Sequence, residues 1–346
     1  MMTSAARARR VTIADVAREA QTSTASVSYA LNGRPGISEA TRERVLEVAA
    51  RLGWSPASAA RALAGAGADT IGLVLTKDPR DLSVEPFYMQ FIAGVESALT
   101  VRSRGLLLEV AADADAEVEA IRRWRGSRRV DGVLLTDLRP HDQRIAVVRE
   151  AGVPAVAVGD PSAAAGLTTV WTDDAAAMRQ AVDHLAALGH RRITRVAAPR
   201  RYAYTAIRDD AFDQAARACG LDHDIVRSDL SEDAGAVATR AVLSSPRPPT
   251  GLIFDNDIMA VAALTTAHQR GLSVPGDVSI IAWDDSLLCR LVTPGLTALS
   301  HDVVALGAEA ARRLLDVIDG AEPAVYQEAT PMLQIRASTG PAPTEA

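Results

Sequence analysis

The sequence is poor in several features on which whole classes of protein depend. Among 346 residues there are two cysteines, Cys219 and Cys289, and neither lies in a Cys-x-x-Cys pair or a Cys/His cluster. A disulfide framework and a zinc module are therefore not expected, and a reducing cytoplasm is the expected location. No apolar run approaches the ~18 residues that a membrane span needs. The basic first ten residues are followed by polar ones instead of the apolar stretch of a secretory signal, so we expect no membrane contact.

Sequence motifs of catalysis are missing as well. No Gly-x-Gly-x-x-Gly follows an apolar strand, and there is no Walker lysine motif, His-Glu-x-x-His or Gly-x-Ser-x-Gly. The adjacent Asp284 and Asp285 would point to opposite faces of a strand, which argues against an acid–base pair. Neither an enzymatic activity nor a cofactor is therefore expected.

The composition that remains is that of a folded protein with an uneven charge distribution. Hydrophobic residues make up 48% and charged residues 23% of the chain, whose length suits two or three domains. Residues 1–64 carry nine arginines and five acidic residues, whereas the whole chain has a net charge of −6. A basic head on an acidic body indicates that the head faces a polyanion. Lys77 is the only lysine, which we attribute mainly to genomic composition bias.

The head is predicted to contain three helices. Thr12 and Asp15 have the spacing of a capping box at the start of the first helix. Ser23 is placed to cap a second helix over 24–31, and Ser38 to open a third that runs to Leu52. A first helix that braces a second one with small polar residues on its open face is typical of a helix-turn-helix. A generic three-helix bundle with a solvated face is the alternative on this pattern alone.

The body is predicted to be a doubly wound α/β structure. From Thr70 onward, short apolar runs alternate with amphipathic stretches, which indicates buried parallel sheets. The runs are 71–75, 106–111, 131–135, 154–158, 168–172, 193–198, 251–254 and 278–283. About eight strands are more than one small sheet commonly holds, so we expect two sheets with a cleft between them. The tail after Pro331 is expected to fray.

Over residues 11–64, the sequence resembles the DNA-binding head of the LacI/GalR family of transcription regulators. The segments TIADVA, VSYALNG, ISEATRERV and LGW-P stand in family order, and the resemblance continues through EPFYMQFIAGVE (85–96), HLAALGHRRI (184–193), DND (255–257) and GLSVPGDVSIIAWDD (271–285). It implies an N-terminal all-α helix-turn-helix head and a two-lobed body with the periplasmic-binding-protein fold. The expected divisions are a head over 1–55, a hinge helix and linker over 56–68, and an effector-binding and dimerisation domain over 69–340.

For the head, the resemblance implies contacts to bases in the major groove. Thr24, Ala25 and Tyr29 occupy the positions that read bases, where small residues allow close approach and methyl groups contact thymine. Many relatives have Arg where Tyr29 stands, and Gly where Gln21 lies in the turn. The operator sequence therefore cannot be copied from Arg-bearing relatives. The full set of expected DNA contacts is Thr24, Ala25, Ser26, Ser28, Tyr29, Arg34, Ala57, Ala60 and Leu63, and Arg34, Arg42 and Arg61 are expected to contact phosphates.

The hinge positions carry their own expectation. By resemblance, Leu63 wedges into a central base step of the minor groove, and ordinary packing against the body is the alternative. Ala57 stands where relatives often have Asn, so one polar contact is absent there.

For the body, the resemblance implies a small-molecule effector, sugar-like or a related metabolite, bound between the lobes. Asn, Asp and Arg side chains supply the donors and acceptors that hydroxyl-rich ligands need. The expected contacts are Phe87, Asp137, Tyr204, Arg208, Asn256, Asp284 and His301. Each has a plainer alternative as a helix cap, a loop brace or a surface residue, and His301 replaces the Gln of some sugar-responsive relatives. Trp171 and Trp283 fit stacking on a sugar face or core packing.

Together these expectations describe a homodimeric, cytoplasmic, ligand-responsive regulator of the repressor type that binds a near-palindromic double-stranded operator. The effector either releases or strengthens operator binding, since the same parts serve both responses. The alternative is a periplasmic-type solute receptor, whose body would look the same but which would lack the head.

Overall fold

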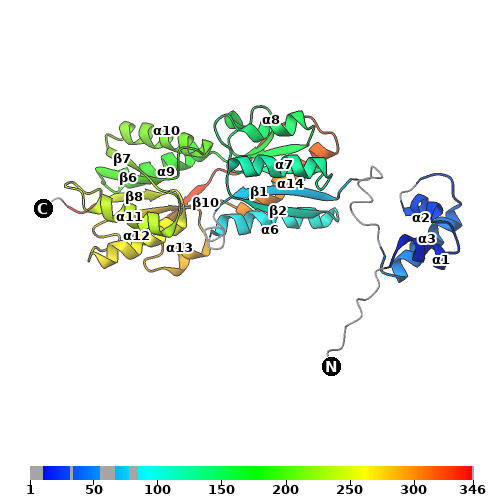
Figure 1. Cartoon of the computed structure of the whole chain (residues 1–346). Coiled ribbons are helices and arrows are strands. Elements are labelled where there is room, and N and C mark those ends of the chain that lie inside the picture. Colours follow the sequence, from blue (N-terminus) through cyan, green and yellow to red (C-terminus); the bar gives the residue numbers. More distant parts are fainter. Residues whose placement is uncertain (1–10, 32–33, 55–66, 78–84, 345–346) are drawn as a thin grey trace, which may run out of the picture. The chain divides into compact units, whose positions relative to one another are not determined.

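The computed structural model describes residues 11–31, 34–54, 67–77 and 85–344 (Figure 1). The chain divides into two compact units, Met1–Asp69 and Thr70–Ala346. The predicted hinge contacts Ala57, Ala60 and Leu63, like Arg61, lie outside the described residues.

The first unit contains the three predicted helices: α1 (Ile13–Glu19), α2 (Thr24–Leu31) and α3 (Glu39–Arg51). The capping box at α1 is confirmed, because the Thr12 side chain accepts from the Asp15 backbone and the Asp15 side chain accepts from the Thr12 backbone. Ser38 caps α3 as predicted. Gln21, between α1 and α2, has a φ of 51°, the left-handed conformation that favours glycine.

A small apolar core holds these helices together. It takes Val16, Ala17 and Ala20 from α1 and its end, Val27 and Ala30 from α2, and Val45, Val48 and Ala49 from α3. The inner face of α2 is thus Val27 and Ala30, and the half-buried Leu31 packs against the same core. The helices use their apolar stripes inward, which leaves the polar face of α2 to solvent.

The second unit consists of two lobes, each built on a six-stranded sheet (Figure 1). The first sheet has the order β11-β5-β4-β3-β1-β2 and the second the order β12-β10-β9-β8-β6-β7. All the eight predicted runs form strands, namely β1 (Thr70–Thr76), β2 (Gly105–Ala111), β3 (Gly132–Leu135), β4 (Ala155–Val158), β5 (Thr168–Trp171), β6 (Arg192–Ala197), β8 (Gly251–Phe254) and β9 (Ser279–Trp283). They pair in parallel, so the doubly wound prediction is confirmed.

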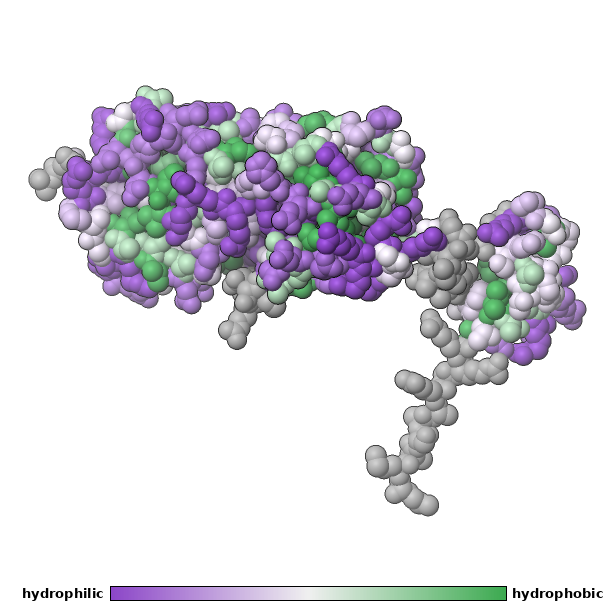
Figure 2. All heavy atoms as spheres, turned by 45° about the horizontal axis from the view of Figure 1, so that its top comes forward, coloured by the Kyte–Doolittle hydropathy of each residue, from purple (hydrophilic) through white to green (hydrophobic). Residues whose placement is uncertain are grey.

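Helices cover both faces of each sheet. In the first lobe, α6 (Pro86–Val101) and α14 (Val303–Ile318) share a core on one face, and α7 (Ala114–Gly126) and α8 (Gln143–Glu150) share one on the other. In the second lobe, α9 (Asp174–Ala187) and α10 (Ala203–Ala218) lie opposite α11 (Glu232–Leu243) and α12 (Asp257–Gln269), with the short α13 (Leu287–Leu291) beside α12. A short 3-10 helix, η1 (Pro161–Ala163), follows β4. The surface turned to the viewer in Figure 2 mixes polar and apolar side chains over both lobes.

The chain crosses between the lobes instead of completing one before the other. It leaves the first lobe after β5, returns between β10 (Thr297–Ser300) and α14, and crosses again between β11 (Val325–Gln327) and β12 (Met332–Gln334). Across the described parts of the chain, no helix is both long and apolar enough to span a membrane.

Four strands were not predicted. The edge strand β7 (Asp222–Arg227) reads DHDIVR and carries three charges besides a histidine, so its apolar pattern is weak. β10 has four residues, and β11 and β12 have three each with both ends exposed. β7, β11 and β12 lie at the edges of their sheets, and they exist because the rest of the fold offers a strand to pair with, not because of their own apolar pattern. β10 lies between β9 and β12 and is too short for a clear apolar run.

The expectation that the tail after Pro331 frays is wrong. Beyond β12, the buried Ser338 donates to the Ile280 carbonyl at 2.6 Å, and Ala342 donates its backbone N–H to Leu188. The fully buried His190 contacts Ser279 and the Gly340 carbonyl. The tail is held by polar contacts to residues about 60 to 150 positions away, which no local pattern reveals.

Two glycines allow α6 and α14 to touch backbone to backbone. A Cβ on Gly94 would lie 2.0 Å from the Val304 carbonyl oxygen, and one on Gly307 would lie 2.2 Å from that of Phe91. No side chain fits between the helices at this crossing.

Gly94→Ala is therefore expected to lower the free energy of unfolding by about 1–3 kcal/mol, since backbone cannot move aside as a side chain can. Gly126→Ala is the matched control, because a Cβ there meets nothing within 4 Å and alanine is the better helix former. Urea unfolding of both variants measures the difference. Equal midpoints for the two would contradict the close crossing.

Candidate functional site

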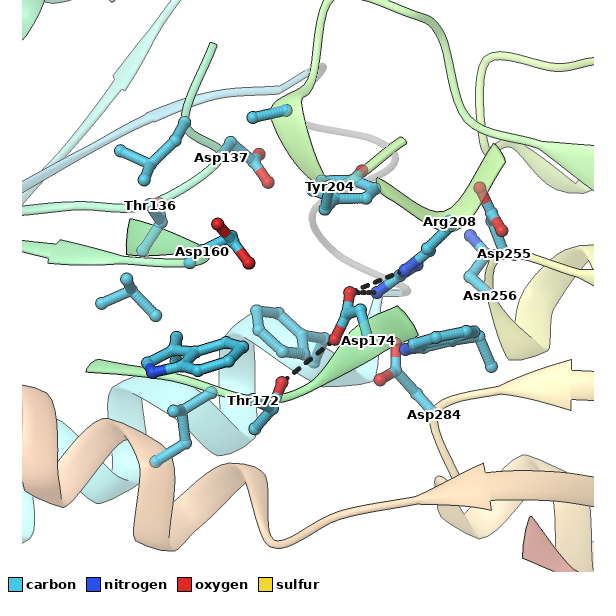
Figure 3. Close-up of a pocket in the computed structure, with 18 of the residues that line it drawn as sticks. Thr136, Asp137, Asp160, Thr172, Asp174, Tyr204, Arg208, Asp255, Asn256 and Asp284 are labelled. Carbon is cyan, nitrogen blue, oxygen red and sulfur yellow. Dashed lines mark hydrogen bonds and ion pairs between the residues drawn. The ribbon is translucent and has the colours of Figure 1, made fainter. Parts of the chain in front are cut away.

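The second unit holds a cleft between its two lobes. It is lined by residues that follow the carboxyl ends of strands in both sheets, where ligands bind in open α/β folds. Thr136 and Asp137 follow β3 and Asp160 follows β4, while Asp255 and Asp284 follow β8 and β9. Strand ends from two lobes thus direct polar side chains toward one space (Figure 3).

The structure brings all seven predicted effector contacts to this cleft: Phe87, Asp137, Tyr204, Arg208, Asn256, Asp284 and His301. They come from α6, from the loop after β3, from α10, and from the ends of β8, β9 and β10. Residues separated by more than 200 positions in the sequence therefore meet at one site.

Arg208 is the most constrained of these side chains. Its Nε and Nη2 atoms each lie 2.8 Å from Asp174 Oδ2, and its guanidinium carbon lies 3.5 Å from the ring centroid of Trp283 and 4.6 Å from that of Tyr204. Burial opposes its charge, but Asp174 and Asp255 outweigh that effect and raise the pKa of Arg208. Figure 3 shows the Asp174 carboxylate directed at Arg208, and the same carboxylate accepts a hydrogen bond from the Thr172 hydroxyl. Arg208 is a fixed cation on the cleft wall.

Trp171 and Trp283, the two tryptophans of the cleft lining, have different surroundings. Trp283 is buried beneath Arg208, which occupies one face of the ring. Trp171 also lines the cleft and is half-buried, and its Nε1–H has no hydrogen-bond partner among the described residues.

Asp284 and His301 form the wall opposite Asp137. Asp284 has a φ of 63°, and its Oδ1 lies 3.3 Å from His301 Nε2. Both ring nitrogens of His301 are buried without a hydrogen bond of good geometry among the described residues. The His301 ring centroid lies 6.3 Å from that of Phe87. Ring nitrogens without a hydrogen bond, next to a carboxylate, are suited to hydrogen-bonding a ligand hydroxyl.

Asn256 has a structural role as well as a place in the cleft wall. Its Oδ1 accepts from the Met259 backbone as the N-cap of α12, and its Nδ2 donates to the Leu230 carbonyl. Of the plainer alternatives, the helix cap is therefore a role that Asn256 has. Asp255 instead accepts two bonds from the fully buried Arg195, at 2.9 and 2.7 Å.

Several lining residues were not predicted as effector contacts. These include Lys77, Glu85, Asp160, Thr172 and Asp174. Lys77, Asp160, Thr172 and Asp174 come within three residues after a strand, so the signal was present in their positions. Each alone looked like a strand end or a helix cap, and Asp160 does cap η1.

Asp257, next to the cleft at the start of α12, is a buried carboxyl with an unpaired oxygen among the described residues. Burial raises its pKa from 3.8 to about 7, with a further increase from Asp284 and an opposing hydrogen bond from Ser286. The folded protein thus binds a proton that the unfolded chain releases near pH 4, so the stability from this group is lost as the pH rises toward 7.

Asp257→Asn is expected to gain about 3 kcal/mol of stability relative to the parent as the pH rises from 5 to 8, because the pKa of Asp257 lies two units above pH 5 and each unit corresponds to about 1.4 kcal/mol. Urea unfolding at both pH values measures it. Asp277→Asn is the control, because hydrogen bonds from Ser273 lower the pKa of Asp277 and keep it ionised across this range. A difference from the parent that does not change with pH would refute the buried acid.

The first unit presents the predicted DNA-contacting residues of α2 on its surface. Thr24, Ala25 and Tyr29 are exposed, and Ser26 and Ser28 are half-buried. Ser26 is locally engaged, since its hydroxyl lies 2.9 Å from that of Ser23. Arg34 is exposed as well.

Arg42, which is predicted to contact a phosphate, also has partners within the head. Its guanidinium donates to the carbonyls of Ala30 at 3.1 Å and Arg34 at 2.9 Å. These bonds tie the end of α2 and the following turn to α3, so Arg42 acts as a brace within the head.

Comparison with known proteins agrees with this architecture. Residues 12–57 match the family of bacterial regulatory proteins called lacI, and residues 182–339 match the periplasmic binding protein-like domain. The HTH-type transcriptional regulator CelR of Thermobifida fusca is 33% identical over 91% of this chain and 94% of its own length. A solved CelR–cellobiose complex is 31% identical, with a TM-score of 0.73 over 95% of this chain and all of the other. The Lac repressor dimer bound to operator and the anti-inducer ONPF is 26% identical, with a TM-score of 0.83 over 96% of this chain and all of the other.

These matches decide between the two functions that the body alone allows. A solute receptor would share the lobes but not the helix-turn-helix head, and here the head matches regulatory proteins and the whole length matches a regulator. The chain therefore belongs to the LacI family of bacterial regulatory proteins and is a DNA-binding transcriptional regulator.

Proposed function

We propose that this regulator is a homodimeric, cytoplasmic repressor without enzymatic activity, whose affinity for its operator is set by a sugar-like molecule bound between the lobes. The observation that carries the proposal is the convergence of side chains from both lobes on one cleft, with Arg208 held by Asp174 on its wall. The cellobiose complex of CelR and the operator complex of the Lac repressor dimer support it by analogy.

The charges in the cleft favour a neutral ligand. Among the described residues that line it, six are acidic and two, Lys77 and Arg208, are permanently basic. Both cations already contact carboxylates, Lys77 with Glu85 and Asp137 and Arg208 with Asp174. A phosphate or carboxylate would meet an excess of negative charge in a partly buried space. Hydroxyl groups can instead donate to Asp160 and Asp284.

The proposed coupling is mechanical. Since the chain crosses between the lobes at several points, a ligand that contacts both lobes changes their relative orientation. We propose that the segment 56–68 carries that change to the heads of the dimer, with Leu63 as the residue that contacts the minor groove. A shift in the spacing of the two heads changes operator affinity.

A thermal-shift screen tests the ligand. Neutral mono- and disaccharides, beginning with cellobiose, are expected to include a compound that raises Tm, because a ligand that binds only the folded state stabilises it. Their phosphorylated and carboxylate counterparts are expected to have no effect. A panel in which no sugar shifts Tm would contradict the proposed effector class.

Gel retardation with fragments flanking the gene tests DNA recognition. Thr24→Asp places a carboxylate at the start of α2, where the helix tolerates it but DNA phosphates repel it. Retardation by the parent and its loss in Thr24→Asp are expected, while Ser127→Asp, an exposed position at the end of α7, binds as the parent does. Equal retardation by all three proteins would exclude α2 from the interface.

A further inference from the structure

The single lysine of this chain lies inside the cleft. The sequence has 37 lysine and arginine residues, and Lys77, directly after β1, is the one lysine among them. Its side chain is 9% exposed, so it is not a surface residue in which lysine and arginine are interchangeable. At a buried position the two side chains are not equivalent, because the lysine ammonium is a compact point charge whereas the arginine guanidinium is a planar group with several fixed donors.

On its own lobe, Lys77 binds the residue that begins the loop after β3. Its Nζ lies 3.7 Å from Asp137 Oδ2 and 3.5 Å from Glu85 Oε2, and it lies 5.1 Å from the ring centroid of Tyr88. Tyr88 in turn donates its hydroxyl to the same Asp137 oxygen. Asp137 needs this support because its φ is 49°, in the left-handed region.

Lys77 also contacts the other lobe. Its Nζ lies 5.6 Å from the ring centroid of Tyr202, the residue that precedes α10 in the second lobe. Arg201 lies over the same ring at 4.9 Å, but it belongs to the same lobe as Tyr202. Burial opposes the charge on Lys77, yet Asp137 and Glu85 outweigh it and raise the pKa of the ammonium. The cation is therefore permanent, as a cation–π contact requires.

The two residues that Lys77 contacts flank a hydrogen bond between the lobes. Ala203, next to Tyr202, donates its backbone N–H to the carbonyl of Leu138, next to Asp137, at 2.7 Å. Asp137 and Tyr202 thus precede the acceptor and the donor of the same bond, and the Lys77 ammonium lies against both.

We propose that Lys77 is a positioning residue for lobe closure, which holds Asp137 on one lobe and Tyr202 on the other so that the Leu138–Ala203 bond can form. This inference rests on the proposed function in one respect: closure matters to DNA binding only if the cleft controls the heads. The closing contact itself does not depend on which ligand is bound.

Reductive methylation of the full-length protein with formaldehyde and cyanoborohydride tests the proposal, since Lys77 is the only side-chain amine and peptide mass spectrometry separates it from the N-terminus. Tyr202→Leu removes the ring and is expected to speed methylation of Lys77 about fivefold, which corresponds to about 1 kcal/mol for a lost cation–π contact. Tyr202→Phe keeps the ring and is expected to react at the parent rate. Tyr326→Leu, a matched change on β11 beside Arg313, is also expected to react at the parent rate.

A second variant acts on the bond itself. Ala203→Pro removes the donated N–H at the first position of α10, where proline is tolerated, and Tyr202 has φ −95° and ψ 136°, which suit a residue before proline. It too is expected to speed methylation, and it serves if Tyr202→Leu fails to fold. Parent rates in both Tyr202→Leu and Ala203→Pro, or an equal rise in Tyr326→Leu, would overturn the proposal. Failure of the proposed effector would appear separately, as a sugar screen without any shift in Tm.

Discussion

Arg195→Met is expected to lower the free energy of unfolding by about 3–5 kcal/mol, the usual cost of breaking a buried ion pair from one side. The Arg195 side chain is fully buried on β6 and bonds both oxygens of Asp255 as well as Asp209. Methionine fills a similar volume but leaves the buried Asp255 with the Ala198 amide as its one hydrogen-bond donor among the residues that the structure describes. The cost therefore comes from an uncompensated charge more than from lost packing. Urea unfolding of the full-length protein measures it.

Two controls separate this cause from a general effect of losing an arginine. Arg312→Met removes a half-exposed arginine from α14 and is expected to cost at most about 1 kcal/mol. Adding Asp255→Asn to Arg195→Met is expected to restore part of the loss, because the amide is neutral. If the double variant were no more stable than Arg195→Met, the uncompensated-charge explanation would be wrong.

Arg208→Met is expected to weaken binding of the sugar identified in the thermal screen by at least about 30-fold, since truncating one partner of a buried, hydrogen-bonded charge pair costs about 2–5 kcal/mol in binding. The change removes a donor from the cleft wall, frees Asp174 and exposes the face of Trp283. Calorimetric titration measures affinity.

Arg200→Met is the matched control for ligand binding. Arg200 is 81% exposed and lies on the same lobe, outside the cleft lining, with a 3.9 Å ion pair to Asp209. It is expected to bind the sugar as the parent does. Equal affinities for Arg208→Met and the parent would remove Arg208 from the binding site and leave it a structural role only.

Much of the fold could be predicted from the sequence because helix caps and buried strands depend on residues that are close together along the chain. The capping residues Thr12 and Ser38 form their bonds within three positions, so spacing alone reveals them. The buried strands appear as apolar runs because both sheet faces are covered by helices. The tail was mispredicted for the opposite reason, since the groups that hold Ser338 and Gly340 lie about 40 positions or more away.

The residues of the candidate site likewise include some that the sequence predicted and others that only the structure revealed. The family resemblance placed seven effector contacts, and the structure brings them to one cleft. The family resemblance did not reveal Lys77 or Asp174 as residues of the cleft. The sequence shows neither what Lys77 contacts across the lobes nor which carboxylate binds Arg208. The phosphate contact expected of Arg42 stays a prediction, and its two carbonyl acceptors within the head become visible only once α2 and α3 are packed together.

The sequence by itself determined the class of this protein: a helix-turn-helix head, a doubly wound body, and a regulator family shared over nearly the whole chain. Only the tertiary structure decided which polar side chains of the cleft are already engaged, as Asn256 is with the Leu230 carbonyl and Arg208 is with Asp174. The physical reason is that periodicity and capping depend on neighbours along the chain, whereas a charge buried between two lobes acquires its partners only when distant strand ends meet.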